Sequence, residues 1–157
     1  MLVNSVLAIK RIESISPVSG IKYVYTGASN GEETKLHKFV RANKNKKIVA
    51  VQGLGFVGTV MSLVVANSDE DQYAVIGVDQ ANSSNYWKIA EINDGICPII
   101  SSDPLVLDMF KKSREKDNFY ATSDTDSFAY ASVIIVDVNL DVIKITDLTE
   151  RSHVERE

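Results

Sequence analysis

The sequence predicts an α/β fold in which a parallel sheet is flanked by helices, and three observations lead to it. Residues 48–51 form a short, apolar run rich in β-branched side chains, which is typical of a strand covered on both faces. Glycines follow at positions 53, 55 and 58, and a helical pattern then begins. A second apolar run, residues 73–78, ends in Asp79. Strand, glycine turn, helix and strand in this order predict a βαβ unit.

The glycine spacing predicts a site for a diphosphate. Gly53 permits the tight turn, Gly55 leaves room for a diphosphate to approach the backbone, and Gly58 lets the helix pack closely on the strand. The free N–H groups of the first helical turn would face the phosphates. Asp79 lies 21 residues after Gly58, where its carboxylate can accept hydrogen bonds from the adenosine ribose and would repel a 2′-phosphate. The pattern therefore favours NAD over NADP. The alternative interpretation of the motif is that the glycines belong to an ordinary loop and that Asp79 caps a helix.

The composition is that of one globular domain. Of the 157 residues, 45% are hydrophobic and 24% charged, which suits a chain with a core of its own. No apolar run reaches about 18 residues, so no membrane span is expected. The N-terminus has no basic stretch before its apolar part, so we expect no signal peptide. The single cysteine, Cys97, excludes an internal disulfide and fits a cytoplasmic protein.

The net charge of −4 is unevenly distributed along the chain. Residues 1–46 hold eight Lys/Arg and three Asp/Glu, whereas residues 47–157 hold nine and eighteen. The larger part is therefore acidic, which argues against general nucleic-acid binding. His37 has no second ligand near it in the sequence, so no metal site is expected.

Residues 1–46 form an N-terminal extension with one predicted strand and one predicted helix. Residues 21–26 alternate like a strand between two glycines. Ser29 and Glu32 have the spacing of a capping box, so a helix is expected to begin there. Its basic face is interpreted as a solvated surface.

Three further helices and two further strands are predicted in residues 56–138. A helix over 56–67 is apolar on most sides and is expected to be buried. A helix over 82–93 ends at Gly95, and another begins at Asp103-Pro104. Residues 118–122 and 132–138 read as strands, the second as a buried one, with a helical turn over 124–130 between them. Right-handed crossovers then give the strand order 3-2-1-4.

The predicted organisation is an extension over 1–46, a Rossmann-like domain over 47–139 and a charged tail over 140–157. The fourth strand would be an apolar edge, exposed unless the extension, the tail or a partner chain covers it, and the strand over 21–26 is the obvious internal candidate.

From residue 47 to about residue 138 the chain resembles the N-terminal domain of the UDP-glucose/GDP-mannose dehydrogenase family, the NAD-dependent nucleotide-sugar dehydrogenases. The glycine turn and the strand that ends in Asp79 carry part of the resemblance. Asn-x-Gly-x-x-Pro-Ile at residues 93–99 is more specific, because it separates this family from malate- and lactate-type dehydrogenases. Residues 121–124 and 131–136 complete the match.

The resemblance implies an oxidoreductase that uses NAD to convert the sugar C6 alcohol of a UDP- or GDP-sugar to a carboxylate, in polysaccharide biosynthesis. The cofactor-binding residues that it implies are Gly53, Leu54, Gly55, Phe56, Val57, Gly58 and Asp79. Asn139 stands where the family usually has a cofactor-contacting Pro-Thr pair and is the remaining candidate. The family's catalytic cysteine and lysine belong to later domains, which we expect this chain to lack, so no residue here is assigned to catalysis. Cys97 is interpreted as a structural thiol.

Two functions stay open at this point. The chain is either the NAD-binding domain of such a dehydrogenase, binding NAD without turnover by itself, or a non-catalytic nucleotide-binding or subunit-pairing module. The expected partner is NAD, with a nucleotide sugar bound only together with the later domains, and homo-oligomerisation is left open. A short-chain reductase is disfavoured because no tyrosine is followed by lysine four residues on.

Overall fold

The computed structural model describes residues 11–27, 34–68 and 72–138. A four-stranded parallel sheet lies at its centre, in the order β5-β4-β3-β6. Its strands are Phe119–Thr122 (β5), Tyr73–Val78 (β4), Lys47–Gln52 (β3) and Val133–Val136 (β6). Counted from β3, this is the predicted order 3-2-1-4. β3 and β4 pair in register from Lys47 opposite Tyr73 to Gln52 opposite Val78.

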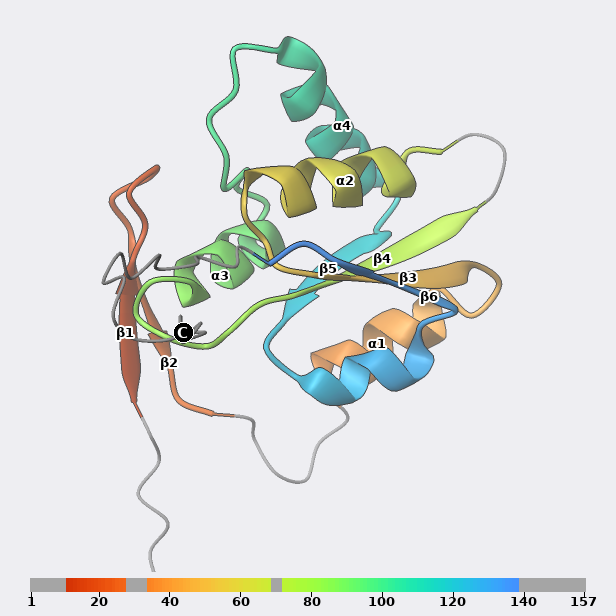
Figure 1. Cartoon of the computed structure of the whole chain (residues 1–157), viewed down its shortest axis with the longest axis horizontal. Coiled ribbons are helices and arrows are strands. Elements are labelled where there is room, and N and C mark those ends of the chain that lie inside the picture. The colour runs from red at the N-terminus through yellow and green to blue at the C-terminus, as the bar shows by residue number, and fades with distance from the viewer. Residues whose placement is uncertain (1–10, 28–33, 69–71, 139–157) are drawn as a thin grey trace, which may run out of the picture.

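Helices cover both faces of the sheet (Figure 1). α2 (Phe56–Ala66) and α4 (Pro104–Glu115) lie on one face, and α1 (Lys35–Ala42) and the 3₁₀ helix η1 (Thr125–Tyr130) on the other. α3 (Tyr86–Asp94) follows β4 and packs against β5 and the N-terminal strands. Alternate residues of a strand face opposite sides. Val49 and Val51 of β3 therefore join the core beneath α2 and α4, while Ile48 joins the core with α1.

Several local predictions are confirmed in detail. The Asp103 carboxylate accepts the Leu105 N–H at 2.9 Å and caps α4, with Pro104 as its first residue. α3 ends at Gly95, whose φ of +82° lies in the left-handed region that glycine adopts without strain. These signals act within a few residues of the chain, so they can be read from the sequence alone.

The N-terminal extension differs from the prediction. It contains an antiparallel hairpin of two strands, β1 (Ile12–Ile15) and β2 (Lys22–Tyr25), so one strand was missed. β1 was missed because its buried side is not apolar. It buries Ser14, while Ile15 is 62% exposed. β2 pairs with β1 and does not cover β6, so that expectation was wrong. α1 begins at Lys35 with Thr34 as its cap rather than near Ser29, and residues 28–33 lie outside the described ranges.

The expected burial of β6 and of the helix over 56–67, which is apolar on most sides, is also wrong for the described residues. Val133, Ile134 and Val136 are 51%, 50% and 61% exposed, because β6 pairs only with β3 among the described strands. Exposed apolar side chains also follow one side of α2: Phe56, Val57, Met61 and Val64. Within residues 11–27, 34–68 and 72–138, no helix is long and apolar enough to cross a membrane. The predicted tail over 140–157 lies outside the described residues.

Candidate functional site

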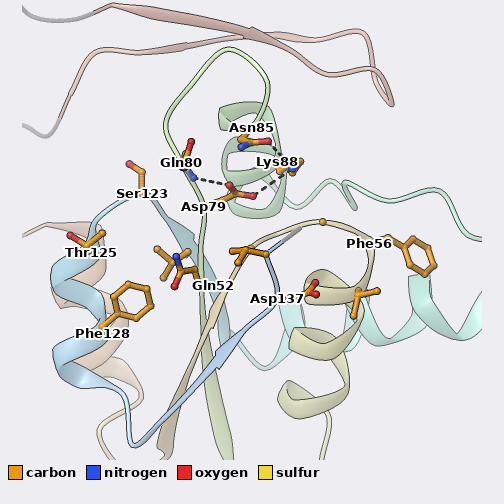
Figure 2. Close-up of a pocket in the computed structure, with 15 residues that line it drawn as sticks. Gln52, Phe56, Asp79, Gln80, Asn85, Lys88, Ser123, Thr125, Phe128 and Asp137 are labelled. Atoms are coloured by element: carbon orange, nitrogen blue, oxygen red, sulfur yellow. Dashed lines mark hydrogen bonds and ion pairs between the residues drawn. The ribbon is translucent and has the colours of Figure 1, made fainter. Parts of the chain in front are cut away.

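A pocket of about 680 Å³ opens at the carboxyl ends of the parallel strands (Figure 2). This is the edge at which open α/β sheets bind ligands, and the volume is within the usual range for a small-molecule site. The lining residues come from all four strand ends, the glycine turn, α3 and η1: Gln52, Gly53, Gly55, Phe56, Val57, Val78, Asp79, Gln80, Asn85, Lys88, Ser123, Thr125, Phe128, Asp137 and Val138.

Close packing of the glycine turn requires two of its three glycines. Gly53 has a φ of +97°, and a Cβ there would overlap the backbone carbonyl oxygen of Asp137. A Cβ on Gly58 would overlap the carbonyl oxygen of Gly53. The turn is thus pressed between the end of β6 and the first turn of α2. Gly55 differs, because a Cβ on it would meet nothing within 4 Å. Its free side therefore leaves room for a ligand at the pocket wall.

The N-terminus of α2 forms one side of this open space. Gly55 is its N-cap residue and, being a glycine, offers no side chain to cap the helix. The first N–H groups of a helix have no partner within the helix, and its dipole places partial positive charge there. Backbone N–H groups beside an uncrowded glycine suit the oxygens of a diphosphate.

Asp79 ties the end of β4 to the glycine turn. Its Oδ2 accepts the Leu54 N–H at 3.0 Å, and its Oδ1 accepts the N–H of Gln80 at 2.7 Å. The side chain is 9% exposed. An ionised carboxylate offers about four acceptor positions, so it can still receive a hydroxyl from a ligand.

A lysine from α3 approaches the same carboxylate (Figure 2). Lys88 Nζ lies 3.5 Å from Asp79 Oδ2 and donates to Asn85 Oδ1 at 2.9 Å. The side chain of Lys88 is 19% exposed. This wall of the pocket therefore combines a carboxylate, an ammonium group and an amide, which can together bind the hydroxyls of a ribose.

A second carboxylate, from Asp137, lies on the other side of the glycine turn. Its Oδ2 is 3.2 Å from the Cβ position on Gly58, and its backbone N–H donates to Gln52 O at 2.8 Å. A negative charge at this place opposes the binding of an anion to the α2 N-terminus.

The structure brings five of the predicted cofactor-binding residues to the pocket: Gly53, Gly55, Phe56, Val57 and Asp79. The side chain of Leu54 is instead buried, at 1% exposure, and Gly58 lies beneath the turn. Asn139 lies outside the described residues.

Sequence reasoning missed the other polar lining residues: Gln52, Gln80, Asn85, Lys88, Ser123, Thr125 and Asp137. Ser123 and Asp137 directly follow β5 and β6. Because parallel strands end at one edge of a sheet, these positions could have been found from the predicted strand order. Asn85 and Lys88 are three residues apart and therefore share one face of α3.

Cys97 lies apart from this pocket. It is partly buried beside the core, where burial raises the pKa of its thiol. Its Sγ lies 3.7 Å from Ile99 O. A neutral, hydrogen-bonded thiol matches the structural interpretation. In the part of the chain that the structure describes, no group of three or more His, Cys, Asp or Glu side chains could hold a metal ion.

Comparison with known proteins adds two similarities. Residues 46–150 match the model of the UDP-glucose/GDP-mannose dehydrogenase family, NAD binding domain. The fold is similar to the crystal structure of NDP-N-acetyl-D-galactosaminuronic acid dehydrogenase from Methanosarcina mazei Go1, with a TM-score of 0.57 and 21% sequence identity. That similarity covers 74% of this chain and 24% of that one, so this chain spans about a quarter of its length. A search of curated proteins gives no match.

Proposed function

The chain belongs to the UDP-glucose/GDP-mannose dehydrogenase family, whose NAD-binding domain matches residues 46–150, and from this premise we propose that the pocket beside the glycine turn binds NAD. One observation carries the proposal. The N-cap residue of α2, Gly55, has no capping side chain and leaves an open side next to the helix N-terminus, and Asp79 lines the same pocket. This arrangement fits a diphosphate next to an adenosine ribose.

Each part of the pocket has a role in this proposal. The α2 N–H groups would hold the diphosphate, and Asp79 would accept a ribose hydroxyl through its remaining acceptor position. Lys88 would donate to the same ribose, since its ammonium group already lies beside Asp79. The negative charge of Asp79 disfavours a 2′-phosphate, so the proposed ligand is NAD rather than NADP.

We further propose that this domain supplies the cofactor site of a nucleotide-sugar dehydrogenase that oxidises a sugar C6 alcohol to a carboxylate. NAD, when bound, supplies the hydride acceptor. No residue that lines the pocket is assigned to catalysis, since Asp79 and Lys88 are assigned to the ribose, and Cys97 lies outside the pocket. We therefore expect the isolated chain to bind NAD without producing NADH from UDP-sugars.

The exposed strand β6 favours a second, compatible role as a pairing module. A dinucleotide fold places the nicotinamide side on strands beyond the fourth. β6 has no strand on its outer edge among the described residues, and three of its four apolar side chains are half exposed or more. A partner strand added at β6 would bury this edge and complete the second half of the site.

Calorimetric titration of the chain with NAD and with NADP tests the first proposal. Wild type should bind NAD in a saturable manner and bind NADP more weakly. Asp79→Asn should weaken NAD binding by about tenfold, because a charged acceptor is lost, and should narrow the preference over NADP because Lys88 loses its acidic partner.

Asp108→Asn is the matched control. Asp108 is an exposed residue of α4 that does not line the pocket, and its substitution makes the same change of charge. If Asp79→Asn binds NAD and NADP with the same affinities as wild type does, the assigned role of Asp79 is contradicted. Absence of NAD binding by the folded wild-type chain would overturn the proposed function.

A further inference from the structure

The first turn of α3 receives its cap from a distant part of the chain. Its N-cap residue, Asn85, makes no capping hydrogen bond with its side chain. The Trp87 N–H instead donates to Ser14 Oγ of β1 at 3.1 Å, and the same hydroxyl donates to Ser83 O at 2.8 Å. A side-chain oxygen that accepts the second N–H of a helix is the normal geometry of an N-cap. Here it comes from 73 residues earlier in the sequence.

The Asn85 side chain is directed at the pocket rather than at its own helix. Asparagine is among the residues most favoured as N-caps, but Asn85 Oδ1 accepts Lys88 Nζ at 2.9 Å instead. Lys88 in turn lies 3.5 Å from Asp79. Asn85 is thus at once the N-cap residue of α3 and the partner of Lys88.

The β1–β2 hairpin holds α3 at further points along its length (Figure 1). The rings of Tyr25 and Tyr86 lie 5.0 Å apart, and Ser19 Oγ donates to Glu91 Oε1 at 2.5 Å. Ser14 itself is 1% exposed. The hairpin precedes residues 46–150, so it lies outside the part of the chain that matches the family.

We propose that the β1–β2 hairpin is a positioning element of the cofactor pocket, in which Ser14 caps α3 and thereby keeps Asn85 and Lys88 directed at Asp79. Without the Ser14 hydroxyl, the buried Trp87 N–H loses the acceptor that it has in the structure. Asn85 has an αR backbone, so its Oδ1 can turn to the N–H groups of its own helix once that backbone shifts to the extended form usual for an N-cap. Lys88 then loses the partner that orients it. The link to NAD rests on the proposed function, but the link to Lys88 does not.

The test compares Ser14→Ala with Ser113→Ala. Ser113 is a matched control, because it is fully buried in α4, donates to a backbone carbonyl at 2.7 Å and does not line the pocket. The first measurement is the rate at which acetic anhydride acetylates Lys88, followed by peptide mass spectrometry and normalised to the exposed lysines. We expect Ser14→Ala to raise this rate severalfold and Ser113→Ala to leave it unchanged.

The second measurement is the affinity for NAD. Ser14→Ala should weaken binding by up to about fivefold, the fold-change equivalent to a cap of about 1 kcal/mol. In a Lys88→Met background the same substitution should have no further effect, because Ser14 acts through Lys88. A purely structural role would weaken binding equally in both backgrounds.

Each outcome decides the proposal. If Ser14→Ala folds and the acetylation rate of Lys88 is unchanged, the proposal is overturned. It is also overturned if Ser14→Ala raises this rate but leaves the affinity for NAD unchanged. If the folded wild type binds no NAD, the proposed function fails, and the reactivity of Lys88 alone decides whether Ser14 positions it. If Ser14→Ala does not fold, Asn85→Ala removes the partner of Lys88 without touching the hairpin. It should then raise the reactivity of Lys88, and an unchanged rate would overturn the proposal.

Discussion

Substitution of Gly58 by alanine should separate the structural glycines of the turn from the one that faces the ligand. An added Cβ at position 58 would overlap the carbonyl oxygen of Gly53, would lie 3.1 Å from its carbonyl carbon, and would lie 3.2 Å from Asp137 Oδ2. The obstructing atoms at Gly53 belong to the backbone, so no rotamer change can relieve the overlap. α2 must therefore move away from the turn, or the turn must open.

The expected cost follows from the kind of overlap. Inserting an extra carbon into a well-packed site costs about 1 to 3 kcal/mol, and a backbone neighbour that must move favours the upper end, about 3 kcal/mol. For a chain of this size, 1 kcal/mol corresponds to a change in Tm of about 2–4 °C. We therefore expect Gly58→Ala to fold with a Tm lowered by about 6–12 °C.

Thermal unfolding followed by circular dichroism measures this change, and Gly55→Ala is the control. A Cβ at Gly55 meets nothing within 4 Å, so its Tm should change by less than about 2 °C. Its methyl group would project beside the α2 N-terminus, so NAD binding should weaken although stability is kept. A Tm for Gly58→Ala within 2 °C of wild type would refute the reasoning, since the turn would then have to yield without cost.

Two further predictions concern Asp137 and Cys97. Asp137→Asn removes a negative charge beside the glycine turn, so it should tighten NAD binding about threefold in calorimetry. The control Asp108→Asn should leave the NAD affinity unchanged. An unaltered NAD affinity of Asp137→Asn would mean that the diphosphate lies away from Asp137. Burial raises the pKa of the Cys97 thiol. The rate at which iodoacetamide alkylates this thiol should therefore reach half its plateau at a higher pH in the folded chain than in the urea-unfolded chain. In the unfolded chain the thiol pKa is about 8.5. Because the fold favours the neutral thiol, the protonated Cys97 contributes to the free energy of unfolding. This contribution is complete below the thiol pKa of the unfolded chain and is lost as the pH rises through the thiol pKa of the folded chain. A folded-chain midpoint at or below that of the unfolded chain would contradict the prediction.

Most of the central sheet was predictable because its signals are local. The apolar run of β3, the glycine turn and Asp79 lie within a short stretch, and each has a direct physical reason for its place. The cap of α4 at Asp103 and the end of α3 at Gly95 are encoded by single residues. The strand order then followed from the handedness of crossover connections.

Only one strand of the N-terminal hairpin was predictable in the same way, since the strand expected over 21–26 is β2 whereas β1 was missed. β1 is four residues long and carries no alternating apolar pattern, since its buried residue is Ser14. Its position depends on hydrogen bonds to Ser83 and Trp87, which lie far along the chain. Patterns within a window of neighbouring residues contain no information about such pairs.

The sequence by itself determined the parallel sheet, the glycine turn and the acid at the end of β4, because backbone preferences and apolar periodicity act over a few residues. Only the tertiary structure decided that Lys88 lies beside Asp79, that Asp137 approaches the turn, and that β2 pairs with β1 instead of covering β6. It also decided that a serine from the hairpin caps α3. These features depend on which distant segments meet, and that is settled by the packing of the whole fold.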